Sequence, residues 1–154
     1  MIYPKVLVPL DGSALAECAL PHVKKMAKEG FVKEIILLTV IDIHPSAFME
    51  GSDVTVIYQA QLDNSREYFK NLQAQFQTEG IDVKTEILQG ATAQTIADYA
   101  RQNAVDLIVI ATHGHTGMKR LMFGSVALRV MHESPVPVLL IRPEACQTAG
   151  KRSA

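Results

Sequence analysis

Small and hydroxyl-bearing residues are concentrated between Ala111 and Val126, a segment that begins ATHGHTG and ends GSV. Glycine has no Cβ, so a glycine-rich loop lets backbone N–H groups approach a ligand closely. The first turn of a helix adds unpaired N–H groups and a positive dipole end, which favour an anion by about 0.3–1 kcal/mol. The segment therefore indicates a phosphate site. A structural alternative is equally compatible: Ser125 caps a helix, and Gly114 and Gly117 only form turns.

A second group of chemically useful residues, Asp11-Gly12-Ser13, follows a strand-like run. Asp-Gly is a turn signal and Ser13 is a natural helix cap, so a structural role is again as good an interpretation as a ligand role. The position favours a ligand, because open α/β sheets bind ligands beyond the carboxyl ends of their strands. If the two strands are neighbours, Asp11 faces the glycine loop across a crevice.

The histidines do not predict a metal centre. His113 and His115 lie two apart in the glycine loop, and no Cys or carboxylate accompanies them at the spacing of a zinc site. The chain also lacks GxxxxGK[ST], the first lysine of the segment being Lys119, and no base is placed beside an orienting partner. We therefore expect no metal site built by the protein alone, no catalytic residues, and no machinery for fast catalysis.

Five short runs predict the strands that must position these residues. They are Lys5–Pro9, Glu34–Ile41, Asp82–Leu88, Asp106–Ala111 and Val136–Ile141. Between the strands, apolar residues recur at helical spacing. These are Leu15, Ala19, Val23 and Met26, then Leu62, Phe69, Leu72 and Phe76, then Ile96, Ala97 and Ala100, and finally Ala127, Val130 and Met131. Such alternation predicts a doubly wound α/β fold with a parallel sheet and helices on both faces.

Two of the strands have the character of sheet edges. The third alternates, with Val83 and Thr85 opposed by Lys84 and Glu86, so one face is wetter than the other. The fifth is apolar but carries Pro137, which cannot donate to a ladder. Because an exposed apolar edge is an aggregation hazard, we expect Val136–Ile141 to pair with a second copy in a homodimer.

Composition limits the classes of partner. Lys and Arg number 15 and Asp and Glu 16, a net charge of −1, so a general nucleic-acid binder is not expected. No apolar run approaches the roughly 18 residues of a membrane span, and the N-terminal residues lead directly into a strand without a signal peptide. Cys18 and Cys146 are not expected to pair. We expect a cytoplasmic protein that does not contact membranes.

Three further segments are less regular. Pro21 lies inside the first helical pattern and predicts a bend there. The segment Asp42–Tyr58 is long for a connection and is a candidate lid or partner surface. Residues 1–142 are expected to form the domain, and the polar residues 143–154 a disordered tail.

The motifs together resemble the universal stress protein family. Its nucleotide motif is glycine, two residues, glycine, nine residues, glycine and serine or threonine. Gly114 and Gly124-Ser125 match it in register, whereas Ala111 stands where the first glycine is usual. The opening KVLVPLDGSALAECAL and the closing PVPVLLIR are also similar, and the resemblance covers residues 3 to 142.

The resemblance implies a Rossmann-like sheet in the order 3-2-1-4-5 that binds ATP, with Mg²⁺ as a possible companion. Pro9 and Asp11 would border the nucleotide, Asp11 at the ribose or at a phosphate-bound Mg²⁺, and Val40 would line the adenine. Ser125 and Val126 would contact the phosphates next to Gly124. The ribose and phosphates would be wrapped by Ala111, Thr112, His113, Gly114, His115, Thr116 and Gly117.

The function implied by the resemblance is an ATP-binding regulatory protein of the stress response, acting as a homodimer and open to a protein partner. One alternative is a slow ATPase or phosphotransfer enzyme, with Asp11 and Mg²⁺ assisting hydrolysis. Another is a nucleotide-free dimerisation module, which the alanine at position 111 keeps open. A nucleotidyl-transferring enzyme is disfavoured, because His113-Gly114-His115 lacks the HxGH spacing and follows the wrong strand.

Overall fold

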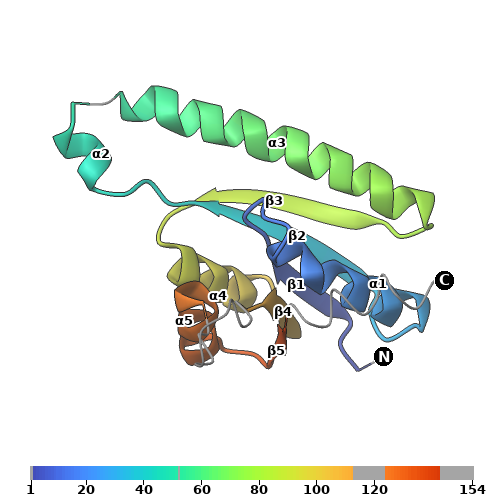
Figure 1. Cartoon of the computed structure of the whole chain (residues 1–154). Coiled ribbons are helices and arrows are strands. Elements are labelled where there is room, and N and C mark those ends of the chain that lie inside the picture. The colour runs from blue at the N-terminus through green and yellow to red at the C-terminus, as the bar shows by residue number, and fades with distance from the viewer. Residues whose placement is uncertain (1, 52, 113–123, 143–154) are drawn as a thin grey trace.

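Strands and helices alternate along the chain (Figure 1), and the computed structural model describes residues 2–51, 53–112 and 124–142. The strands are β1 (Lys5–Pro9), β2 (Glu34–Ile41), β3 (Val83–Gln89), β4 (Leu107–Ala111) and β5 (Val138–Ile141). The helices are the 3-10 turn η1 (Ala16–Ala19), α1 (Leu20–Lys28), α2 (Ser46–Met49), α3 (Val54–Thr78), α4 (Thr92–Gln102) and α5 (Ser125–Glu133).

The strands form one sheet in the order β3-β2-β1-β4-β5, and all four neighbouring pairs are parallel. The predicted fold class and strand order are therefore confirmed. In the centre of the sheet, Val6 is in register with Ile35 of β2 and with Leu107 of β4. The order reverses between β1 and β4, so the connections that leave these two strands diverge and leave a crevice at their carboxyl ends.

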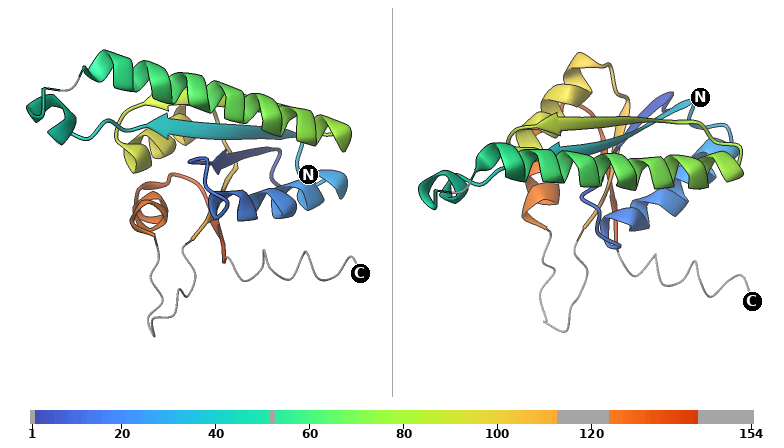
Figure 2. Two further views of the ribbon diagram at one scale, coloured as in Figure 1. Left: turned by 45° about the horizontal axis from the view of Figure 1, so that its top comes forward. Right: turned by 90° about the horizontal axis from the view of Figure 1, so that it is seen from above.

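Helices cover both faces of the sheet, as the views in Figures 1 and 2 agree. On one face, α1 and α3 bury Val23, Phe69 and Phe76 against inward-facing residues of β1 and β2. On the other face, α4 and α5 bury Ile96 and Val130. This two-sided cover is why β1, β2 and β4 are continuous apolar runs.

Both predicted edge strands lie at the edges. In β3, Val83 and Ile87 pack toward the α1–α3 core, and Lys84 is exposed. The last strand is shorter than predicted, because Pro137 precedes it and contributes only its carbonyl, which accepts the Ile108 N–H at 3.0 Å. Leu139 in the middle of β5 is 39% exposed.

Two predictions about helices were wrong. Pro21 does not bend a helix interior: it lies in the first turn of α1, after the 3-10 turn η1, where a missing N–H costs little. The Glu17 carbonyl accepts the Leu20 N–H instead. Met131 does not face the core but is 43% exposed, since Ala127 and Val130 are the residues of α5 that α4 and the sheet bury.

The segment predicted as a long connection is partly helical. It contains α2 and the first turn of α3, which Asp53 caps by accepting the Thr55 and Val56 N–H groups. In Figure 1, α2 and the beginning of α3 extend past the end of β3. The predicted tail, residues 143–154, lies outside the described residues.

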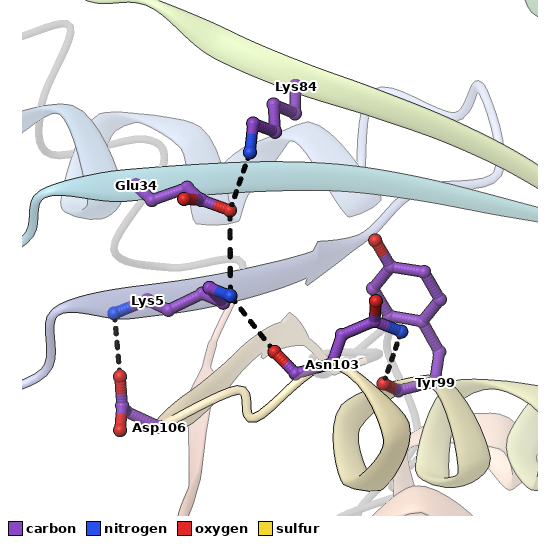
Figure 3. Close-up of polar contacts among 6 residues, drawn as sticks. All are labelled: Lys5, Glu34, Lys84, Tyr99, Asn103 and Asp106. Carbon is purple, nitrogen blue, oxygen red and sulfur yellow. Dashed lines mark hydrogen bonds and ion pairs between the residues drawn. The ribbon is translucent and has the colours of Figure 1, made fainter.

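Polar contacts close the amino end of the sheet (Figure 3). Glu34 at the start of β2 contacts Lys84 at 3.2 Å and Lys5 at 3.8 Å. The Lys5 Nζ also donates to the Asn103 carbonyl at 3.0 Å, and the Lys5 N–H donates to Asp106 at 2.8 Å. These contacts join β1, β2, β3 and the α4–β4 turn, so the side chains at this end of the sheet hold the elements together.

Candidate functional site

A pocket opens at the opposite end of the sheet, where β1, β2 and β4 finish. It encloses about 290 Å³, close to the lower limit of small-molecule sites. Residues from five separate parts of the chain meet there: the end of β1 with the loop and η1 turn that follow it, the ends of β2 and β4, and the beginnings of α4 and α5. The predicted site residues that line it are Pro9, Asp11, Val40, Ala111, Gly124, Ser125 and Val126.

The pocket has an apolar side and a polar side. Leu38, Ile96 and Ile110 are buried and present aliphatic surface, and Val40 adds to it. Asp11 and Ser13 come from the β1–η1 loop, and Ser125 comes from the first turn of α5. An amphipathic ligand, with a flat apolar part and an anionic part, matches this division.

The loop after β1 holds itself in place through short-range hydrogen bonds. The Ser13 N–H donates to Asp11 Oδ1 at 2.9 Å, and the Ala16 N–H donates to Ser13 Oγ at 3.1 Å. Gly12 between them has φ +84°, which a side chain would disfavour. Ser13 therefore accepts a backbone N–H in the turn before η1, whose N-cap position is Leu15, while Asp11 remains exposed at the pocket.

The first turn of α5 offers amide donors to the pocket. Gly124 is its N-cap and supplies no side-chain acceptor, and the first turn contains no acidic residue. Ser125 is consequently the first helical residue and does not cap the helix, contrary to the structural alternative for it. The N–H groups at the start of a nine-residue helix lack helical acceptors, so this end of the pocket attracts an anion.

The backbone of Val40 is directed toward the pocket side of β2. The Gly90 N–H donates to the Ile41 carbonyl at 3.1 Å, on the β3 side, and the Leu10 N–H donates to the Leu38 carbonyl at 2.8 Å, on the β1 side. Because bonding groups alternate sides along a strand, the N–H and C=O of Val40 face the same side as those of Leu38. There β1 has already ended at Pro9.

Not every predicted residue is placed at the pocket. Thr112 is buried and donates its N–H to the Ile141 carbonyl at 2.9 Å, and it does not line the pocket. The structure therefore does not place Thr112 in a loop around the ligand. Its backbone instead joins the end of β4 to the end of β5. His113, Gly114, His115, Thr116 and Gly117 lie outside the described residues.

Sequence reasoning missed one polar residue of the pocket, Thr92. Thr92 begins α4, and both its N–H and its hydroxyl donate to Asp42 Oδ2 at 3.4 Å. The two residues are 50 positions apart, and only the adjacency of β2 to the start of α4 brings them together. The Gly90-Ala91 turn before an apolar helical pattern was the available signal, since it marks a strand end at the same rim of the sheet.

A second unpredicted contact connects the loop after β1 to α3. The Tyr68 hydroxyl donates to Glu17 Oε1 at 2.9 Å. Burial raises the pKa of Tyr68 above its ordinary value, and the bond to Glu17 and the charges of Glu17 and Asp11 raise it further. The long helix α3 is thus fastened to the segment that forms one wall of the pocket.

Among the described residues, no three His, Cys, Asp or Glu side chains are grouped so that they could hold a metal ion. In that same part of the chain, no helix combines the length and the hydropathy that a membrane crossing requires.

Comparison with known proteins gives a consistent result. Residues 2–142 match the model of the Universal stress protein family. Universal stress protein MJ0531 of Methanocaldococcus jannaschii is 34% identical over 143 residues, which cover 92% of this chain and 83% of that protein.

Two solved structures are informative. The structure of MJ0577, from the same organism, is 32% identical with a TM-score of 0.77, over 92% of this chain and 97% of that one. A universal stress protein from Archaeoglobus fulgidus, solved in complex with dAMP, has a TM-score of 0.66 over 92% of this chain and 99% of that chain. At 22% identity, the second likeness establishes the fold alone.

Proposed function

The chain belongs to the universal stress protein family, and from this premise we propose that it binds ATP in the pocket at the carboxyl ends of β1 and β4. The observation that carries the proposal is the pocket itself, where an aliphatic side and a helix N-terminus with a glycine at its N-cap face one cavity. ATP has the matching division, with a flat base at one end and a polyphosphate at the other.

The phosphate end is supported by α5. No side chain among the described residues caps its first N–H groups, so these donors are suited to phosphate oxygens, and Ser125 adds a hydroxyl. Gly124 stands at the cap position, where the absence of a side chain lets a phosphate approach the backbone. Asp11, exposed at the same pocket, is suited to a ribose hydroxyl or to a Mg²⁺ ion that the phosphates carry.

The base end is supported by β2. The Val40 N–H and C=O form a donor and an acceptor side by side, which complement the N1 and 6-amino groups of adenine. Leu38, Ile96 and Ile110 provide apolar contact for the ring. That a relative with this fold was solved with dAMP agrees with an adenine nucleotide as the ligand class.

Ala111 does not argue against this site. It is the last residue of β4, and it is not among the described residues with positive φ. A glycine is therefore not required for backbone geometry at this position, and the alanine only adds a methyl group to the pocket wall. Its effect is confined to the space left for the ligand.

The proposed role is regulatory. Nucleotide occupancy would alter a homodimer, or its surface for a protein partner, in a cytoplasmic stress response. The exposed edge of β5, with Leu139 39% exposed, supports pairing between two copies. Hydrolysis, if present, would be slow, and Asp11 with Mg²⁺ would assist it.

Calorimetric titration of nucleotide-stripped protein with Mg²⁺ and ATP tests the proposal. We expect saturable heat with one site per chain and a rise in melting temperature that follows RT ln(1 + [L]/Kd). Titration with GTP and CTP provides the comparison for base selectivity. The absence of both heat and thermal shift with every adenine nucleotide would leave the nucleotide-free dimerisation module as the better account.

A further inference from the structure

Thr92 is the polar side chain that interrupts the apolar side of the pocket. The other described lining residues with polar side chains are Asp11, Ser13 and Ser125, which come from the β1–η1 loop and from α5. Thr92 comes from the start of α4, on the side of Val40 and Ile96. In the pose proposed for ATP, a hydroxyl in this place lies on the side of the base and not of the phosphates.

Asp42 fixes which hydrogen-bonding role this hydroxyl has. The Thr92 Oγ1 lies 3.4 Å from Asp42 Oδ2, and a carboxylate oxygen can only accept. The hydroxyl hydrogen is therefore directed to Asp42, which leaves the oxygen lone pairs free to accept a hydrogen bond. Asp42 follows Val40 by two residues, and Val40 and Thr92 both line the pocket.

We propose that Thr92, oriented by Asp42, selects a purine with a 6-amino group over one with a 6-oxo group. This inference rests on the proposed function, since it concerns the same pocket. It names the group on the base, at purine position 6, that the apolar side of the pocket recognises. A 6-amino group donates a hydrogen bond to the Thr92 oxygen, whereas a 6-oxo group presents a second acceptor there. Two facing acceptors repel each other, and each loses a hydrogen bond to water without gaining another in its place.

A structural role for Thr92 makes different predictions. Ala91, the N-cap of α4, has no polar side chain, and Asp42 also accepts the Thr92 N–H at 3.4 Å. Asp42 therefore caps the helix through the backbone, which valine at position 92 would retain. The hydroxyl is not needed for capping, so removing it separates base selection from helix stability.

The experiment compares ATP, ITP and purine riboside triphosphate, which carry an amino group, an oxo group and hydrogen at purine position 6. ITP also carries a hydrogen on N1, which opposes the Val40 N–H in the proposed pose. Purine riboside triphosphate has a bare N1 like ATP, so the comparison of these two isolates the 6-amino group. Calorimetry would give the Kd of each for the full chain and for Thr92→Val. We expect ATP to bind the variant about three- to tenfold more weakly, the size of one hydrogen bond, and purine riboside triphosphate to bind as before. Thr95→Val, one turn further along α4 and outside the pocket lining, is the matched control and should change none of the three.

Asp42→Ala gives a complementary result. Without the carboxylate, the Thr92 hydroxyl can turn its hydrogen into the pocket, so ITP should gain affinity relative to purine riboside triphosphate. The latter nucleotide corrects for the removed negative charge, which affects all three triphosphates alike. Melting temperatures of the variants show whether α4 is still folded.

The outcomes distinguish a failure of the inference about Thr92 from a failure of the proposed ATP binding. If Thr92→Val weakens ATP and purine riboside triphosphate by the same factor, or weakens neither, the inference is overturned while ATP binding stands. The same follows if the wild-type chain binds ATP and ITP equally. If the wild-type chain binds none of the three, the proposed function fails and the inference fails with it.

Discussion

Gly124 is the residue where a single added side chain would most directly interfere with a ligand. It is buried, caps α5 and lines the pocket. Its backbone angles, φ −54° and ψ 140°, are ones that any residue adopts. A larger residue at this position therefore changes the space in the pocket without requiring other backbone angles.

We predict that Gly124→Val abolishes ATP binding and leaves the fold intact, because the isopropyl group occupies the space in front of the first amides of α5. Calorimetry measures the loss, and circular dichroism checks the fold. Glu34→Gln, at the opposite end of the sheet, is the control and should bind ATP like the wild type. If Gly124→Val keeps wild-type affinity, the nucleotide lies elsewhere.

Sequence reasoning identified pocket residues at the ends of strands and at the start of α5, but it missed the polar residue at the start of α4. Turn signals in the residue types point to Asp11 and to the glycine segment that ends at Ser125, and the family resemblance adds Pro9, Val40 and Val126. Thr92 could not be found this way, because its relation to Asp42 depends on which strand end lies beside which helix start. Residue type likewise suggested a cap at Ser125, whereas Gly124 holds that position.

At the scale of elements, α3 is attached to the pocket wall by the Tyr68–Glu17 hydrogen bond. Tyr68→Phe removes it and should lower the free energy of unfolding by about 1 kcal/mol at pH 7, the typical contribution of one such bond. Urea unfolding measures the difference, and Tyr58→Phe, near the start of the same helix, is the control.

The pH dependence of that pair has a defined sign. Because the pKa of folded Tyr68 is raised, the stabilisation is complete below the unfolded value near pH 10 and is lost as the pH rises above it. The wild type should lose stability above about pH 10 more steeply than Tyr68→Phe. Equal slopes would show that the pKa of Tyr68 is not raised in the folded chain.

A second contact between elements joins the end of α3 to α1. Glu79 accepts hydrogen bonds from Lys24 and Lys28, and these lower its pKa to about 2. A lowered pKa stabilises the fold above the unfolded value of 4.5, and this is lost as the pH falls toward 2. Glu79→Gln should therefore be less stable than the wild type at pH 7, and the two should converge by about pH 2. A constant difference from pH 7 to pH 2, in thermal unfolding, would contradict this.

Most elements could be predicted because the pattern of apolar residues along a strand depends directly on how many of its faces helices cover. Continuous apolar runs gave β1, β2 and β4, and the alternation in β3 gave an edge. The errors arose where local rules had two outcomes. Pro21 is compatible with a bent helix or with a helix start after a 3-10 turn, and the sequence does not distinguish them.

At the scale of the whole molecule, the two ends of the sheet differ in kind. The amino end is closed by the contacts among Lys5, Glu34 and Lys84, and the carboxyl end holds the pocket. Variants at one end should therefore change stability without changing ligand affinity. This separation makes Glu34→Gln a usable control for the pocket.

The proposed homodimer is also a property of the whole molecule. Leu139→Lys places a charge on the exposed side of β5 and should convert a dimer into a monomer, because pairing would bury the ammonium group. Light scattering at micromolar concentration measures the mass. Lys84→Leu, on the opposite edge strand, should remain dimeric. A monomeric wild type would refute the edge-pairing argument.

The most direct test of the whole account is a crystal structure of the chain grown with Mg²⁺ and ATP. We expect the base against Leu38 and Val40, with the phosphates in front of the first turn of α5. Nucleotide density on any other surface of a chain with this fold would contradict the account.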